Sequence, residues 1–161
     1  MTRFQCIPIP TETAERFRRT GLDDRGNRIR RIEATAGGGF PCRHCLDLGR
    51  PGEMMLLGSY DLSRPRGIYW TPSPILVHER DCARSTAADA VPPVVRTNSL
   101  VSVRAYDAAD QCIYDLGQVC AGGEVDAPLG RALGDVRTTF VNIHTARPGC
   151  LLTTVQPGRA I

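Results

Sequence analysis

The sequence contains no lysine, since all twenty of its basic residues are arginine. It also has a single tryptophan, and no apolar run approaches the ~18 residues that a membrane-spanning helix requires. The opening residues, Met-Thr-Arg-Phe-Gln-Cys-Ile-Pro, lack the apolar stretch and the cleavage site of a secretory signal. The lack of a long apolar run and of a secretory signal predicts a protein that stays in the cytoplasm and does not enter a membrane.

The charge is mild and mixed. The formal net charge is +3, and acidic residues are interspersed with the arginines. One basic cluster spans residues 16–31, but it lacks the repeated aromatic residues on which single-stranded nucleic acids stack. We therefore do not expect nucleic acid as a partner, and the composition names no other partner.

Seven cysteines are many for a chain that is expected in the cytoplasm. An odd count without a secretory signal argues against a disulfide framework. Three roles remain: metal ligands, a reactive thiol, or small buried apolar side chains, which is the common fate of free cysteine.

The order of apolar segments predicts a single α+β domain over residues 1–161. We expect about seven strands, in a mostly antiparallel sheet, among the segments 4–9, 28–35, 53–60, 68–78, 100–106, 112–115, 138–144 and 150–155. Two short helices are predicted over about 12–20 and 126–134, capped by Thr11 and Asp126, with Gly21 ending the first. The arginines of the first helix are expected to face water, and residues 79–97 to form a surface loop. Because the helices do not alternate with the strands, the pattern is typical of the α+β class.

The sharpest chemical feature is the tetrapeptide Cys-Arg-His-Cys at residues 42–45. Two cysteines with two residues between them can present both thiolates to one ion. His78 and Cys82 follow with a spacing that a turn can fold onto the same ion. Cys42, Cys45, His78 and Cys82 therefore predict a structural zinc site of the Cys3His type.

Two other interpretations of these residues stay open. Leu46 stands where zinc-binding turns usually have a small residue, which weakens the zinc interpretation. The first alternative is that the cysteines are small buried side chains and His78 lies on the surface. A thioredoxin-like redox pair is the other alternative, but it requires Cys42 at the start of a helix within a βαβ unit, and the sequence offers no such unit. His44, between the two cysteines, is expected to point away from an ion that they share.

A second constellation predicts different chemistry. A cysteine nucleophile needs a histidine within hydrogen-bond reach, and Cys42 or Cys150 with His144 is the candidate combination. Arg43 and Arg147 are candidates for binding a carboxylate or a phosphate. The alternatives are a histidine that is merely buried and arginines that bind nearby carbonyl groups.

The order of five segments resembles a bacterial family known as domain of unknown function 1203. The resemblance lies in residues 40–46, 51–60, 73–78, 100–107 and 141–150. It implies no activity, but it assigns Cys42, Arg43, His144 and Cys150 to elements that the family shares, and Cys45 and His78 to one branch of it. We therefore carry three hypotheses forward: a binding or accessory domain with a structural zinc, an enzyme that uses a thiol with His144, and an interaction domain without chemistry.

Overall fold

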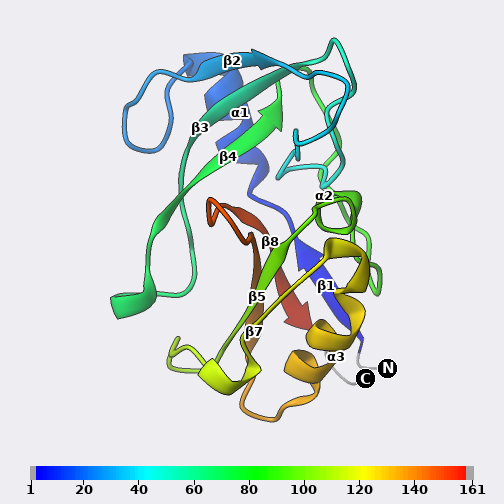
Figure 1. The fold of residues 1–161 in the computed structure, drawn as a ribbon. Helices are drawn as coiled ribbons and strands as arrows, with labels where there is room; N and C mark the ends of the chain where they lie inside the picture. Colours follow the sequence, from blue (N-terminus) through cyan, green and yellow to red (C-terminus); the bar gives the residue numbers. More distant parts are fainter. Residues whose placement is uncertain (1–2, 159–161) are drawn as a thin grey trace.

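Two antiparallel sheets and three α-helices form the computed structural model, which describes residues 3–158 (Figure 1). One sheet has five strands and the other has three. The architecture confirms the α+β prediction, although the strands divide into two sheets where one was expected. Residues 1–2 and 159–161 of the predicted domain lie outside the described residues.

The five-stranded sheet has the order β1-β8-β7-β5-β6 and packs one face against α3 (Asp126–Gly134). Its strands are β1 (Phe4–Ile7), β8 (Leu151–Pro157), β7 (Phe140–Thr145), β5 (Val101–Tyr106) and β6 (Gln118–Cys120). Alternation in the predicted strand 100–106, here β5, buries Val101, Val103 and Ala105 in one core with Leu129 of α3. The buried residues of this large core are uncharged, and all but Cys6 are aliphatic.

The three-stranded sheet has the order β2-β3-β4 and packs against α1 (Thr11–Thr20). Its strands are β2 (Arg30–Glu33), β3 (Met54–Asp61) and β4 (Pro72–His78). Ala14 and Phe17 of α1 are buried, and Gly21 ends the helix with a left-handed φ of 64°. Gly58 lets the helix approach β3 closely, because a Cβ there would lie 2.9 Å from Phe17.

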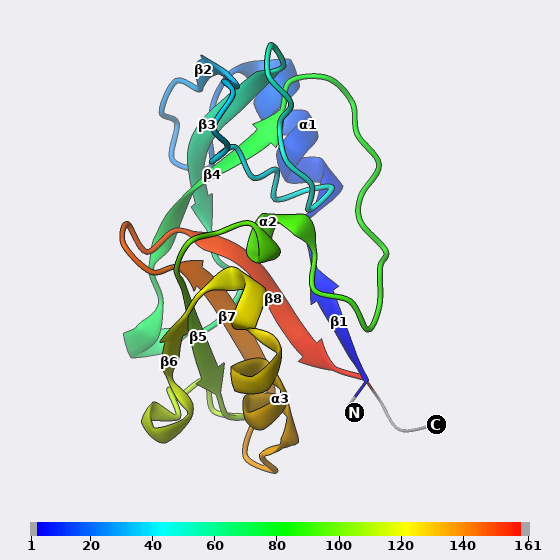
Figure 2. The same cartoon turned by 45° about the vertical axis from the view of Figure 1, so that its right-hand side comes forward.

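A long segment joins the two sheets on the outside of the molecule. Residues 79–92, which we call the strap, run from the end of β4 past α1 to the edge of β1 (Figure 2). Backbone hydrogen bonds tie the strap to distant elements along its length: Glu79 N–H donates to Met54 O at 2.9 Å, Ser85 N–H to His44 O at 3.1 Å, and Asp89 N–H to Phe4 O at 2.9 Å. The strap leads into α2 (Pro93–Arg96).

Two predicted elements are wrong. Residues 112–115 do not form a strand, because only Cys112 bridges Tyr106 before a 3-10 turn, and β6 takes the place beside β5. Residues 79–97 are not entirely a surface loop, because α2 within them buries Val94 and Val95 in the large core.

Both predicted helix caps are also wrong. Neither α1 nor α3 has a side-chain cap hydrogen bond. The hydroxyl of Thr11 lies 2.9 Å from His44 Nε2, and the carboxylate of Asp126 accepts two hydrogen bonds from Arg96. In each case a partner distant in the sequence replaces the local backbone as the hydrogen-bond partner.

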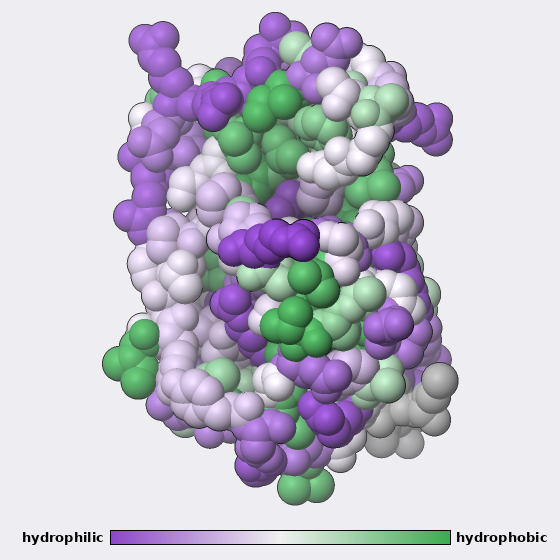
Figure 3. Space-filling model, in the orientation of Figure 1, coloured by the Kyte–Doolittle hydropathy of each residue, from purple (hydrophilic) through white to green (hydrophobic). Residues whose placement is uncertain are grey.

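The surface is mixed in character. On the face in Figure 3, hydrophobic and hydrophilic residues intermingle without a single dominating patch. The large exposed apolar side chains, such as Ile68, Val119 and Val136, belong to separate elements. None of the helices within residues 3–158 has the length and apolar character that a bilayer crossing requires.

Candidate metal centre

The tetrapeptide lies in a tight turn beside the edge of β4. Arg43 N–H donates to Leu76 O of β4 at 2.9 Å, and Leu46 N–H donates back to Cys42 O at 3.0 Å. Leu46 has a φ of 59°, a left-handed conformation that usually favours glycine. The turn thus has the backbone shape that a glycine after the second cysteine would provide, although the residue is leucine. No helix begins at Cys42, so the condition for a thioredoxin-like pair is not met.

The β3–β4 hairpin brings the second pair of candidate ligands back to this turn. The antiparallel register places His78 opposite Met55, and Leu76, two residues earlier, bridges to Cys42. Cys82 follows at the start of the strap. The long sequence gap between Cys45 and His78 is therefore filled by the hairpin and does not separate them in space.

Four side chains converge as the cysteine and histidine spacing predicts. One ligand atom from each of Cys42, Cys45, His78 and Cys82 lies within 4.8 Å of every other. The Cys42 and Cys82 sulfurs are 3.9 Å apart, and the Cys45 sulfur is 3.5 Å from His78 Nδ1. Tetrahedral zinc bonds imply ligand separations of about 3.8 Å between two sulfurs and about 3.6 Å between sulfur and nitrogen. The cluster is therefore compatible with zinc.

The protonation of the three thiols is strongly coupled. Hydrogen bonds from Cys45 and Cys82 hold the pKa of Cys42 far below its usual value. The same interactions with Cys42, together with burial, raise the pKa values of Cys45 and Cys82. Without a cation, one thiolate is stabilised at the expense of the other two. A bound divalent cation reverses this order, because it stabilises every thiolate that contacts it.

The His78 ring is placed between the cluster and a carboxylate. Its Nδ1 faces Cys45, and its Nε2 is buried 3.3 Å from Glu53 Oε2. Interaction with Cys42 raises the pKa of His78, while the backbone N–H of Arg50 and the Arg80 guanidinium lower the pKa of Glu53 to about 2. An ionised carboxylate behind the distal ring nitrogen is the usual support of a metal-binding histidine.

Two donors point at the sulfur of Cys82 from outside the cluster. Arg18 Nη2 donates to it at 3.4 Å, and His44 Nδ1 lies 3.3 Å from it. The other His44 nitrogen contacts the hydroxyl of Thr11. His44 is thus outside the group of four, but its ring faces the sulfur of Cys82 and does not point away from the cluster as expected. Three thiolates and one divalent ion carry a net negative charge, which the Arg18 guanidinium offsets.

Sequence reasoning missed Arg18, whose side chain was expected to face water. Its side chain is only 13% exposed, and Nε also donates to His78 O at 3.1 Å. A signal was present: Ala14, Phe17 and Arg18 are three and four residues apart, which places Arg18 on the buried face of α1.

His144, the histidine of the second constellation, contacts the backbone of its own turn. His144 Nδ1 lies 2.9 Å from Gly149 O, and no hydrogen bond within residues 3–158 joins His144 to Cys42 or Cys150. Burial, with contributions from nearby arginines, lowers the pKa of His144 to about 4, so the ring is neutral near pH 7. A nucleophile paired with His144 stays a prediction.

The two candidate anion-binding arginines differ in their surroundings. Arg43 is only 4% exposed and donates to Leu151 O and Pro41 O, both at 2.7 Å. Burial lowers its pKa to about 10, which leaves it charged at neutral pH. Arg147 is exposed and contacts Ser99 Oγ. The two guanidinium groups therefore do not form a common site in the described part of the chain.

Comparison with protein families places this geometry in a wider group. The family model described as "Protein of unknown function (DUF1203)" matches residues 39–156, well over half of the chain. The chain belongs to this family. The matched span contains all four clustered residues but not Arg18, which lies before it. No curated protein and no solved structure matches the chain.

Proposed function

We propose that the protein is a binding or accessory domain in which a structural zinc ion is held by Cys42, Cys45, His78 and Cys82. The observation that supports this proposal is the convergence of three thiols and one imidazole within 4.8 Å of one another, with two of the separations close to those of tetrahedral zinc ligands. Four protein ligands saturate zinc and leave no position for water or substrate, which distinguishes structural from catalytic zinc. The role is therefore to stabilise the fold and not to activate a reactant.

The donor set favours zinc over other ions. Thiolates disfavour magnesium and calcium, which prefer oxygen ligands. Most protein-bound iron–sulfur clusters require four cysteines, whereas one ligand here is an imidazole. Cys42 and His78 are 0% and 1% exposed, so half of the ligand set is sealed from solvent. Burial of this kind suits an ion that exchanges slowly.

The ion would join three segments of the chain at one point. The Cys42–Cys45 turn follows β2, His78 ends β4, and Cys82 begins the strap. The strap has only scattered hydrogen bonds to the rest of the chain, among them those of Arg84 to the carbonyls of Pro8 and Ile9. Zinc would fix the end of the strap nearest the small sheet. A strap fixed at this end would hold α1 and β1 in a constant position relative to each other.

Metal analysis of protein purified without added zinc tests the proposal. We expect about one equivalent of zinc per chain, and less than a few tenths of an equivalent in Cys45→Ser and His78→Asn, because each removes one of four ligands. Cys112→Ser is the matched control: Cys112 is partly buried like Cys45 but lies outside the cluster, so zinc should be retained.

Thiol titration gives an independent readout. In the native protein Cys42, Cys45 and Cys82 should resist a thiol reagent until a chelator is added. A wild-type protein with less than a few tenths of an equivalent of zinc and with every thiol freely titratable would refute the proposal.

A further inference from the structure

The second residue of the tetrapeptide carries a buried positive charge, and the groups of opposite charge nearest to it are the thiols of Cys42 and Cys150 when they are ionised. Arg43 forms no ion pair with a carboxylate among residues 3–158. Its two hydrogen bonds go to neutral carbonyl groups, those of Leu151 and Pro41. A guanidinium has five N–H donors, so three remain, including both on Nη2. Buried N–H groups of a charged side chain that have no acceptor are unfavourable, and an anionic ligand that accepts from them would relieve this cost.

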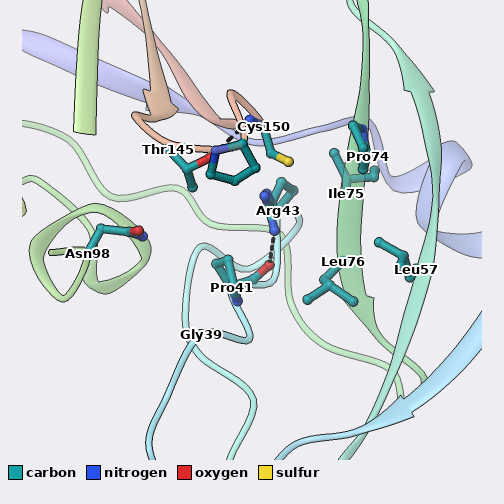
Figure 4. A pocket seen from close by; sticks show the side chains of 11 residues that line it. Gly39, Pro41, Arg43, Leu57, Pro74, Ile75, Leu76, Asn98, Thr145 and Cys150 are labelled. Carbon is teal, nitrogen blue, oxygen red and sulfur yellow. Dashed lines mark hydrogen bonds between the residues drawn. The ribbon is translucent and has the colours of Figure 1, made fainter. Parts of the chain in front are cut away.

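The Arg43 guanidinium borders a pocket between the two sheets. The pocket has a volume of about 200 Å³ and is bounded by β4 on one side and by the turn between β7 and β8 on the other. Figure 4 shows the side chains of Arg43 and Cys150 close to one another in this pocket, with Leu57 and Leu76 on the facing wall. Among residues 3–158, Arg43 is the one charged residue that lines it.

We propose that this pocket binds the carboxylate of a small organic acid, with Arg43 as the anion-binding residue. A single guanidinium edge matches the two oxygens of one carboxylate and balances one negative charge. The leucine and proline side chains of the wall accept a short hydrocarbon group. A phosphate dianion would require a second positively charged side chain, which is absent from the described lining of the pocket. The proposal does not depend on a bound metal.

Cys150 provides a reporter inside the pocket. Iodoacetate carries a carboxylate next to its reactive carbon, whereas iodoacetamide has the same shape without the charge. In both reactions the sulfur forms a bond to the methylene carbon as iodide leaves. If Arg43 holds the carboxylate, Cys150 should prefer iodoacetate, whereas a thiol outside the pocket should not.

The experiment compares the two rates at each cysteine by peptide mass spectrometry. Relative to the same ratio at Cys120, which is also partly exposed, the iodoacetate-to-iodoacetamide ratio at Cys150 should be about 10- to 100-fold higher, the range of a charge-assisted hydrogen bond. Arg43→Gln should abolish this preference. Arg147→Gln, which removes an exposed neighbouring charge, should retain it.

A second readout uses the wild-type protein alone, because Arg43→Gln also removes ties to Leu151 and Pro41 that the fold can require. Millimolar butyrate should slow the reaction of Cys150 with iodoacetamide, and butyramide should not. Equal ratios at Cys150 and Cys120, an equal loss in Arg147→Gln, or no reaction at Cys150 would each overturn the proposal. Stronger protection by inorganic phosphate than by butyrate would overturn the assignment to a carboxylate.

Discussion

The two ends of the molecule are stabilised by different means. The large core, under α3, contains eighteen buried residues that are almost all aliphatic. The core under α1 contains twelve, including Cys42 of the candidate metal centre. A smaller core buries less apolar surface and so contributes less free energy of folding. The cluster of Cys42, Cys45, His78 and Cys82 occurs at the end of the molecule where hydrophobic burial is weaker.

The two sheets therefore differ in what holds them together. The large sheet closes over its core through continuous pairing of five strands. The small sheet has three strands, and its edge strand β4 is covered by the tetrapeptide turn. In small protein units a metal commonly replaces the missing core, and the same argument applies to this end of the molecule.

The largest expected effect is the loss of stability when the metal is removed. Chelation should destabilise the small sheet by several kcal/mol, because the binding energy of structural zinc is also folding energy. Hydrogen exchange, followed residue by residue, should therefore accelerate strongly in β3, β4 and the strap while β5 and β7 change little.

A matched variant tests the opposite end. Leu129→Ala removes a side chain that is 2% exposed in the large core and should cost about 2–5 kcal/mol without changing zinc content. Uniform acceleration of exchange after chelation, or loss of zinc in Leu129→Ala, would contradict the division between the two ends.

The next effect concerns acid and the large sheet. The pKa of His144 is about 4 in the folded protein, below the ordinary value of 6.5, so the unfolded chain binds its proton first as the pH falls. The contribution of neutral His144 is fully present above pH 6.5 and is lost as the pH falls to 4, which amounts to roughly 3 kcal/mol.

Urea unfolding of wild type and His144→Gln between pH 7 and pH 4 measures this contribution. The stability of the wild type should fall more steeply than that of the variant, and any acid effect on the metal centre is common to both. Parallel curves would show that His144 does not contribute to the acid sensitivity.

The smallest expected effect is on zinc affinity when a side chain that contacts the ligands is changed. Arg18→Met removes the donor to Cys82 and to the carbonyl of His78 and should weaken zinc binding by about 10- to 100-fold, the usual cost of losing such a support. Arg19→Met, on the exposed face of the same helix, should leave the affinity unchanged. Competition with a zinc chelator gives both affinities. Equal values for the two variants would show that Arg18 does not contribute to zinc binding.

The parts of this structure that depend on local patterns are predictable from the sequence. Alternating residues identified β5 and β7, the apolar run identified β3, and Gly21 marked the end of α1. The cluster of Cys42, Cys45, His78 and Cys82 was also predicted, because cysteine and histidine have few reasons to recur at such spacings.

The parts that depend on distant partners were not predictable. Strand pairing decides that there are two sheets, and β6, a short edge strand with little burial, carries almost no apolar pattern. Thr11 contacts His44 instead of capping its own helix, a choice that only the folded arrangement makes available. The partners of Arg18, the Cys82 sulfur and the carbonyl of His78, also depend on the folded arrangement, although the spacing of Arg18 from Ala14 already placed it on the buried face of α1.

Leu46 connects the two ends of the molecule. It is hydrogen-bonded to Cys42 through the backbone, yet the leucine packs in the large core and the cysteine in the small one. A single turn of chain is therefore shared between both cores, and neither core can open fully without distorting it. Heat should accordingly unfold the protein in one cooperative transition, and calorimetry of the intact protein should record a single peak of heat absorption instead of two.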